Sequence, residues 1–145
     1  MAAREVFHRD RGLVRYLRES FIRELNAMLT RHFKQFNQNP RYVDVSFDRD
    51  YGIVFRTTTG DLKVSQVSGG ETAQLALALR IALIDLMSPI PLLILDEPFG
   101  SLDEAHRELL GESLSKIAEQ GQLILVTHVH VDSLQLQNRL DLGGY

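Results

Sequence analysis

The sequence of 145 residues contains no cysteine, no tryptophan and only four prolines. The absence of cysteine excludes disulfide bonds and thiolate metal ligands. No apolar run approaches the roughly 18 residues that a membrane-spanning helix needs, and the first ten residues are too polar for a signal peptide. With 44% apolar and 24% charged residues, the composition is that of an ordinary soluble protein. We therefore expect one compact domain, a cytoplasmic location and no membrane partner.

The sequence also lacks a phosphate-binding loop of the pattern G-x-x-x-x-G-K-[ST]. Its paired glycines are Gly69-Gly70 and Gly143-Gly144, and neither pair precedes Lys-Ser or Lys-Thr. Such a loop carries the lysine that contacts the β- and γ-phosphates of a nucleotide. By itself the chain is therefore not expected to hydrolyse a nucleoside triphosphate.

Positive charge is scarce in most of the chain and concentrated near its start. Residues 1–41 contain nine Lys/Arg and four Asp/Glu, a net +5, and residues 42–145 contain seven and fifteen, a net −8, which together give the overall −3. A basic segment next to an acidic body is typical of a surface that faces nucleic acid. Charge alone favours the simpler interpretation, which is a solvated helix face.

The first part of the chain predicts a helix followed by a small antiparallel sheet. Apolar residues recur at three- and four-residue spacing over residues 4–36, with a break expected near Gly12. Residues 42–47 and 51–55 have the composition of strands joined by a short turn, and residues 62–67 form a third extended piece.

The remainder predicts alternating helices and strands. Residues 68–87 predict a helix buried on several sides. Residues 92–95 and 123–126 are short apolar runs typical of parallel strands buried on both faces. A helix over residues 104–120 between them predicts a parallel crossover, and a short helix is expected over residues 131–140. The fold class is therefore α/β, with parallel strands, flanking helices and a small antiparallel hairpin.

The run Ser68-Gly69-Gly70-Glu71 has the composition of a helix start that binds an anion. Ser68 and Glu71 match a capping box, and the two glycines allow backbone N–H groups to approach an anion closely. The positive end of the helix dipole then favours phosphate. A glycine turn with a capping box and no ligand explains the same residues.

Two adjacent acids, Asp96 and Glu97, end the apolar run that begins at Leu92. Ligands of α/β proteins bind at the carboxyl ends of parallel strands. Because neighbouring residues of a strand point in opposite directions, the two acids are suited to different roles, one holding Mg²⁺ and the other orienting a water molecule. Two solvated acids at the end of a strand are the alternative.

Three more polar residues follow the predicted strands. His128 comes directly after the second parallel strand and has the position of a phosphate contact, with His130 a second candidate of the same kind. Asp103, with Ser101 as the alternative, is expected to cap the helix over residues 104–120. Taken singly, each residue is better explained by a purely structural role.

In their order along the chain, these features together resemble the C-terminal lobe of ABC ATPases, and within them the Rad50 and SbcC group. Residues 68–71 resemble the signature motif, and residues 92–97 resemble Walker B with its following glutamate. Residues 101–103 resemble the D-loop and His128 resembles the switch histidine. The resemblance is specific over residues 66–129. SMC heads resemble the chain less, because they usually have Asp-Glu-Val-Asp where this chain has Asp-Glu-Pro-Phe.

The resemblance implies a head that dimerises around two ATP molecules. Asp96 would then position Mg²⁺, Glu97 would polarise the lytic water and His128 would sense the γ-phosphate. Asp103 would contact the opposite head. The residues implied to bind the nucleotide of that opposite head are Ser68, Gly69, Gly70 and Glu71. Arg80, in an otherwise apolar helix, is either a relay of nucleotide docking or an arginine whose head reaches solvent.

The resemblance also implies the domain organisation and the partners. Residues 1–36 would be the root of a coiled coil, and residues 37–145 the C-terminal lobe of the head. The expected partners are an N-terminal segment carrying Walker A, a second head, an Mre11/SbcD-type nuclease at the coil root, and DNA, in the nucleoid or in a eukaryotic nucleus. The chain would be an excised C-terminal segment. The alternatives are an SMC- or RecN-like chromosome-organising head and a non-catalytic scaffold module.

Overall fold

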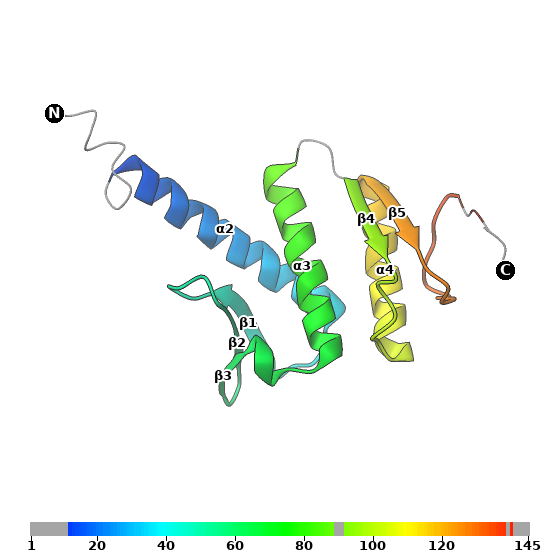
Figure 1. The fold of residues 1–145 in the computed structure, drawn as a ribbon, viewed down its shortest axis with the longest axis horizontal. Helices are drawn as coiled ribbons and strands as arrows, with labels where there is room; N and C mark the ends of the chain where they lie inside the picture. Colours follow the sequence, from blue (N-terminus) through cyan, green and yellow to red (C-terminus); the bar gives the residue numbers. More distant parts are fainter. Residues whose placement is uncertain (1–11, 89–91, 139, 141–145) are drawn as a thin grey trace.

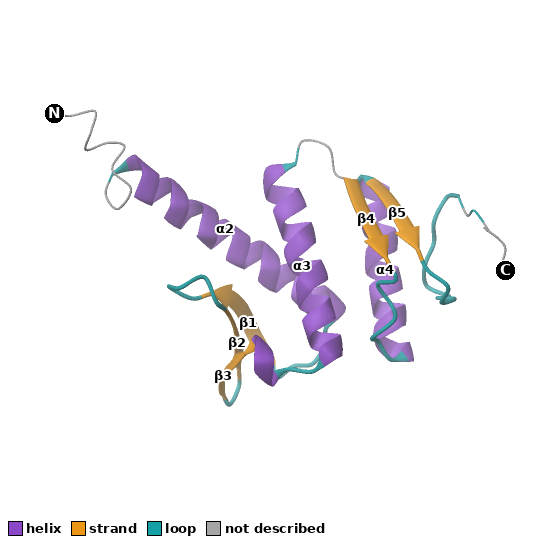
Figure 2. Ribbon diagram, in the orientation of Figure 1, coloured by secondary structure: helices purple, strands orange, loops and turns teal. Residues whose placement is uncertain are grey.

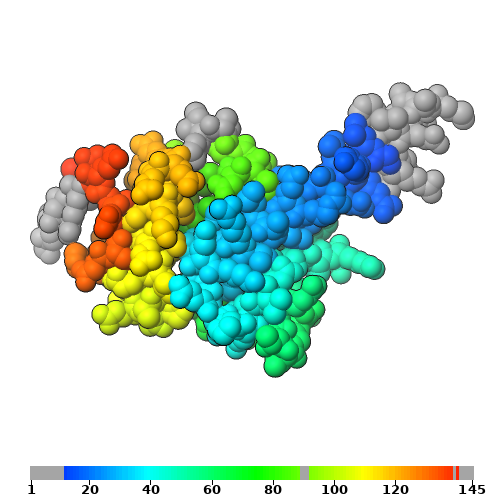
Figure 3. All heavy atoms as spheres, turned by 180° about the vertical axis from the view of Figure 1, so that it is seen from behind, coloured from blue at the N-terminus to red at the C-terminus, as the bar shows by residue number. Residues whose placement is uncertain are grey.

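The computed structural model describes residues 12–88, 92–138 and 140. Helix α2 (Leu13–Phe36) begins directly after Gly12, whose φ of 73° lies in the left-handed region. This agrees with the predicted break, and the part of the predicted helix before Gly12 lies outside the described residues. The buried residues of α2 all lie in its carboxyl half, which packs on the body, while its amino half projects from the body (Figures 1 and 3).

Three antiparallel strands follow in the order β1 (Tyr42–Phe47), β2 (Ile53–Thr57) and β3 (Gly60–Lys63), and a short 3-10 helix, η1 (Val64–Gln66), comes next. The aromatic rings of Phe33, Tyr42 and Phe55 join this sheet to α2. The ring centroids of Phe33 and Tyr42 lie 5.4 Å apart, and those of Phe33 and Phe55 lie 5.3 Å apart. Edge-on contacts at these distances suit the charge distribution of aromatic rings.

Helix α3 (Gly69–Met87) lies in the middle of the molecule, between α2 and β4 (Leu92–Asp96) (Figures 1 and 2). The predicted capping box at its start is confirmed. Its buried residues face α2 and the strands, and they are Gln74, Leu75, Leu77, Ala78, Ile81 and Ala82. Within the described ranges no helix is both long and apolar enough to cross a membrane.

The crossover β4–α4–β5 has the predicted parallel pairing. Helix α4 (Glu104–Gln120) joins β4 to β5 (Gln122–Val126), and the register runs from Leu92 opposite Gln122 to Asp96 opposite Val126. The expectation that these strands are buried on both faces is wrong. Leu93 and Leu95 are buried, but Leu92 is 42% exposed and Ile94 is 60% exposed. The described helices cover only one face of this sheet, so the opposite face is open.

The predicted helix over residues 131–140 is also wrong, because residues 131–138 form no helix. The backbone of this segment is bonded to α4 instead. The N–H groups of Asp132 and Ser133 donate to the Glu108 carboxylate at 3.2 and 2.8 Å, and the N–H of Gln135 donates to Ser115 Oγ at 2.7 Å. The Gln135 N–H is a donor that a helix beginning near Val131 would use within itself, and the bonds from Asp132 and Ser133 hold the segment against α4.

Gly111 of α4 allows this close approach. A Cβ atom at Gly111 would lie 2.5 Å from Ser133 Oγ and 2.7 Å from Val131 Cγ1. We expect Gly111→Ala to lower the free energy of unfolding by about 2 kcal/mol, because overpacking of up to ~3 kcal/mol exceeds the ~1 kcal/mol that alanine gains in a helix. Urea unfolding measures this change. Gly69→Ala is the control, because the new methyl group there would meet no atom within 4 Å apart from its chain neighbours and its own helix backbone. Equal stability of the two variants would contradict the prediction.

Candidate functional site

The start of α3 has the geometry of an open anion site. Ser68 Oγ accepts a hydrogen bond from the Glu71 N–H at 3.2 Å, and the first intrahelical bond runs from the Thr72 N–H to the Ser68 carbonyl at 2.9 Å. The N–H groups of Gly69 and Gly70 have no hydrogen-bond partner among the described residues, as is usual at a helix start. Ser68 and Gly69 are exposed. The two amides and the helix dipole are therefore available to an anion that arrives from outside the chain.

The Glu71 carboxylate is engaged within the protein. One of its oxygens accepts a hydrogen bond from the Ser68 N–H at 2.8 Å, and the other accepts one from the Tyr42 hydroxyl. Burial alone would raise the pKa of Glu71, but the hydrogen bonds from Tyr42 and Ser68 together lower it. Burial and the bond to Glu71 raise the pKa of Tyr42 to about 12. Glu71 is thus ionised at neutral pH and faces the β1 side of the helix.

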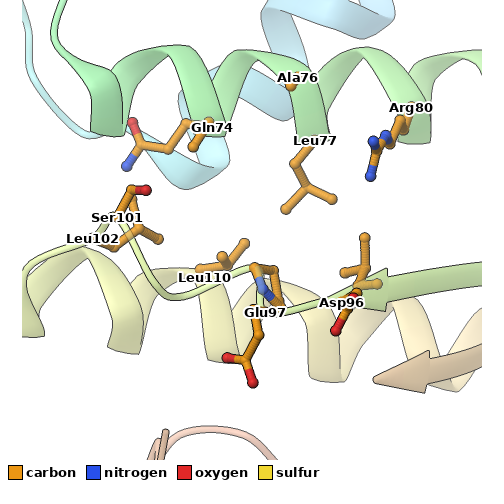
Figure 4. A pocket seen from close by; sticks show the side chains of 12 residues that line it. Gln74, Ala76, Leu77, Arg80, Asp96, Glu97, Ser101, Leu102 and Leu110 are labelled. Atoms are coloured by element: carbon orange, nitrogen blue, oxygen red, sulfur yellow. The ribbon is translucent and has the colours of Figure 1, made fainter. Parts of the chain in front are cut away.

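The two acids at the end of β4 differ in their surroundings. Asp96 is exposed, and its side chain has no hydrogen bond or ion pair with the part of the chain that the structure describes. Glu97 has a φ of 46°, in the left-handed region that non-glycine residues rarely adopt, and its N–H donates to the Val126 carbonyl at 2.9 Å. The backbone turns at Glu97, and the carboxylate of Glu97 points away from α3 (Figure 4).

The Glu97 carboxylate is bound by the loop that follows β5. His128 Nδ1 lies 2.8 Å from Glu97 Oε1, the His128 N–H donates to the same oxygen at 3.0 Å, and Thr127 Oγ1 donates to Oε2 at 3.3 Å. The side-chain bond from His128 is the main reason that the pKa of Glu97 is lowered. A carboxylate with a low pKa is a weak proton acceptor, so this arrangement suits orienting a water molecule better than removing its proton. His130 Nε2 lies 3.0 Å from Oδ1 of the exposed Asp132, and His130 does not contact Glu97.

Asp103 caps α4, as one of the two predicted alternatives had it. Its Oδ1 accepts from the His106 N–H at 2.9 Å and lies 2.7 Å from His106 Nδ1. The backbone and side-chain bonds from His106 lower the pKa of Asp103. The loop before Asp103 also comes close to the helix start of α3, because a Cβ atom at Gly70 would lie 3.4 Å from the Ser101 carbonyl oxygen.

A cleft of about 190 Å³ separates α3 from the segment that carries the two acids. Arg80 extends from α3 into this cleft, toward the strand that ends at Asp96 (Figure 4). No group of three or more His, Asp or Glu able to hold a metal ion occurs in the described ranges. A single unpaired carboxylate such as Asp96 still fits Mg²⁺, since this ion keeps several waters and is often bound by one or two carboxylates together with phosphate oxygens.

Comparison with known protein families decides the affiliation of the chain. The model of the RecF/RecN/SMC N terminal domain matches residues 24–140. The chain belongs to the RecF/RecN/SMC family. The resemblance found in the sequence, to a Rad50/SMC-like ATPase head, is thereby confirmed at the level of the family.

Curated relatives of this RecF/RecN/SMC chain include two archaeal proteins described as DNA double-strand break repair Rad50 ATPases. The protein of Methanocaldococcus jannaschii is 32% identical over 127 residues, and that of Sulfurisphaera tokodaii is 41% identical over 107 residues. These matches cover 86% and 72% of the chain. In both cases the chain spans 12% of the relative's length.

Solved structures confirm the α/β fold of this RecF/RecN/SMC chain. The SMC head domain from Thermotoga maritima is 28% identical, with a TM-score of 0.56 over 74% of this chain and 38% of that one. An Smc head domain with an extended coiled coil from Pyrococcus furiosus, bound to the C-terminal domain of ScpA, is 19% identical, with a TM-score of 0.62 over 82% of this chain and 30% of that one. The second likeness shows the fold alone.

Sequence reasoning about this family member missed two residues beside the site. Tyr42 was assigned only to a strand, and Gln74 only to an apolar helix. Gln74 is 2% exposed. It donates to the Phe36 carbonyl at 3.1 Å and accepts from Asn37 Nδ2 at 2.8 Å, which joins the end of α2 to α3. A buried glutamine in an apolar helix needs such partners, and this was the available signal.

Proposed function

We propose that this chain is the C-terminal lobe of a Rad50-type ATPase head, active in ATP hydrolysis only together with an N-terminal segment that carries Walker A. The observation that carries the proposal is the exposed helix start at Ser68, with the free amides of Gly69 and Gly70. Such a site needs an anion brought from outside, and the γ-phosphate of ATP held by a second head is that anion.

The remaining site residues then have separate roles. Asp96 holds Mg²⁺, which neutralises phosphate charge when it is bound. Glu97 orients the attacking water, and His128 holds Glu97 in place and contacts the γ-phosphate. Asp103 reaches the opposite head from the first turn of α4, and Arg80 relays docking of the nucleotide across the cleft. The lowered pKa of Glu97 supports its role, because the carboxylate stays ionised at neutral pH.

The open face of the parallel sheet supports the need for an N-terminal segment. The exposed apolar residues on this face are Leu92, Ile94, Ile124 and Val126. Apolar side chains of neighbouring parallel strands are normally covered on both sides. We propose that the Walker A segment covers them and continues the sheet, and that residues 37–145 form the C-terminal lobe of the head.

The proposed function is tested by mixing this chain with a Walker A segment. The chain is combined with an N-terminal segment carrying Walker A, and the molar mass is followed by light scattering with and without ATP and Mg²⁺. ATP-dependent formation of a dimer of heads, accompanied by phosphate release, is the expected result. The same molar mass with and without ATP, and no phosphate release, would leave the scaffold module as the explanation.

The Rad50 relatives favour a repair ATPase, and the likeness to the Thermotoga maritima SMC head favours an SMC-like head as the second candidate. A nuclease of the Mre11/SbcD type separates the two. We propose that it binds the projecting half of α2, the root of the coiled coil, where the apolar residues Leu13, Tyr16 and Leu17 are exposed. Failure of this nuclease to bind the assembled head would favour the SMC-like alternative.

DNA is the proposed partner of the basic side chains on α2. Arg15, Arg18 and Arg23 lie on its projecting half, while Arg11 lies outside the described residues. We expect reversal of the three described arginines to glutamate to weaken DNA binding. The slope of the logarithm of the binding constant against the logarithm of the salt concentration should become shallower by about one for each lost phosphate contact. Fluorescence anisotropy at several salt concentrations measures this. Reversal of Arg49, Lys63 and Lys116, three exposed cations elsewhere, is the control, and equal losses would show that only net charge matters.

A further inference from the structure

The Tyr42 ring is a fixed point next to the anion site. Tyr42 is 3% exposed. Its ring contacts those of Phe33 and Phe55, with centroids 5.4 and 5.5 Å away. Packing of this kind leaves the ring one orientation. The hydroxyl group is therefore held at a fixed place at the start of β1.

A chain of hydrogen bonds runs from this hydroxyl to the backbone of the anion site. Arg41 Nη2 donates to the Tyr42 hydroxyl oxygen at 2.7 Å, and the hydroxyl donates to Glu71 Oε1. The other oxygen of the carboxylate accepts the Ser68 N–H at 2.8 Å. The carboxylate therefore joins a buried ring on one side to an exposed backbone amide on the other.

Ser68 has few other ties to the body of the protein. Its N–H and its Oγ are both bonded to Glu71. Among the described residues, its carbonyl accepts only from Thr72, in the first turn of the same helix. The position of Ser68 thus depends on the orientation of the Glu71 side chain. An exposed glutamate would sample several rotamers, whereas the bond from Tyr42 selects one.

We propose that Tyr42 is a positioning residue for the anion site at Ser68–Gly70, acting through Glu71, so that the antiparallel sheet sets the geometry with which this helix start receives phosphate. The inference rests on the proposed function, in which that phosphate belongs to ATP on a second head. Donors that are oriented before binding lose less free energy to ordering when the anion arrives. Removing the hydroxyl should therefore weaken anion binding at Ser68–Gly70 without altering the β4 tip, the residues Asp96 and Glu97 at the end of β4.

Tyr42→Phe tests this with little disturbance, because the ring and its aromatic contacts are kept. In the chain assembled with its Walker A segment, we expect faster exchange of the Ser68 and Glu71 amides, which are the hydrogen-bonded amides of this cap. The ATP concentration for half-maximal dimerisation, and KM, should rise roughly tenfold, as for loss of a hydrogen bond to a charged group. The kcat at saturating ATP should stay within about twofold, because the Asp96, Glu97 and His128 side chains are unchanged.

Tyr51→Phe is the matched control. Tyr51 lies in the turn of the same sheet and is 56% exposed, so the same atom is removed far from Glu71. This variant should match the wild type in exchange, dimerisation and KM. Equal behaviour of Tyr42→Phe and Tyr51→Phe would overturn the inference, and so would an equal fall of kcat and kcat/KM in Tyr42→Phe.

A double-mutant cycle with Glu71→Gln tests whether Tyr42 acts through Glu71. An amide has one acceptor oxygen where a carboxylate has two, so the glutamine cannot accept from both the Tyr42 hydroxyl and the Ser68 N–H as Glu71 does. We expect the double variant to need about as much ATP for dimerisation as the more impaired of the two single variants, since both changes break the same connection. Effects that multiply would show independent action and overturn the inference. Amide exchange needs no ATP, so the two hypotheses fail separately. Unchanged exchange in Tyr42→Phe refutes the role of Tyr42, even if wild-type heads dimerise. Faster exchange in Tyr42→Phe, together with no dimer of wild-type heads, refutes the proposed function instead.

Discussion

Glu97→Gln is expected to leave ATP binding intact, to lower turnover at least about 100-fold, and to trap the ATP-bound dimer of heads. The size follows from the 10²- to 10⁴-fold that a positioned acid or base usually contributes. The amide is neutral and has one acceptor oxygen, which the bonds from His128 and Thr127 compete to occupy. Little acceptor capacity then remains for the attacking water. Phosphate release under steady-state conditions and light scattering with ATP measure the two effects.

Glu108→Gln is the matched control for that experiment. Glu108 is also a carboxylate that accepts backbone N–H groups, from Asp132 and Ser133, and hydrogen bonds from Ser133 lower its pKa as well. The same chemical change is thus made in a similar setting on α4, away from the β4 tip. Glu108→Gln should cost some stability and little turnover. Normal hydrolysis by Glu97→Gln would refute the assignment of the lytic water to Glu97.

Ser68→Arg is the second large effect, and we expect it to weaken ATP-dependent dimerisation at least about 100-fold, comparable to loss of a well-placed anion donor. The serine lies at the exposed start of α3, with open space in front of Gly69. An arginine side chain would occupy the space through which the second head brings its phosphate. The cap is also lost, but this costs only about 1 kcal/mol of stability, so the lobe stays folded.

The control for Ser68→Arg is the same substitution at Ser65. Ser65 is exposed in η1, three residues before the cap, so it adds an equal charge and an equal side chain outside the helix start. Sedimentation with ATP compares the two variants, and thermal unfolding checks that both are folded. Dimerisation of Ser68→Arg at wild-type ATP concentrations would show that this helix start does not form part of the head interface.

Features that depend on neighbouring residues were predictable from the sequence. The capping box of Ser68 and Glu71 needs two side chains and one helical turn, and the Asp103 cap needs one side chain and the following amides. The pairing of β4 with β5 followed from two apolar runs separated by one helix. The four motifs were sufficient to identify the family because their order and spacing are read directly from the chain.

The errors arose where another part of the chain competed with local preference. Residues 131–138 form no helix, because hydrogen bonds to Glu108 and Ser115 hold this segment against α4 where the two pass close at Gly111. The strand that begins at Leu92 was expected to be covered on both faces. One face is open because the described helices cover only the other face of the sheet. The connection from Tyr42 to Glu71 spans 29 positions, and no local pattern signals a bond between a strand residue and a helix cap.

The sequence by itself determined which residues have the chemistry of the site: a pair of glycine amides at a helix start, two acids at the end of a strand and a histidine after the next strand. These are properties of residue type and of short-range backbone geometry, which neighbours along the chain decide. Only the tertiary structure decided how the side chains are committed: Glu71 to Tyr42, Glu97 to His128, and Asp96 to none of the described residues. Hydrogen bonds act over about 3 Å, so such partners are chosen by the packing of segments that are distant in sequence.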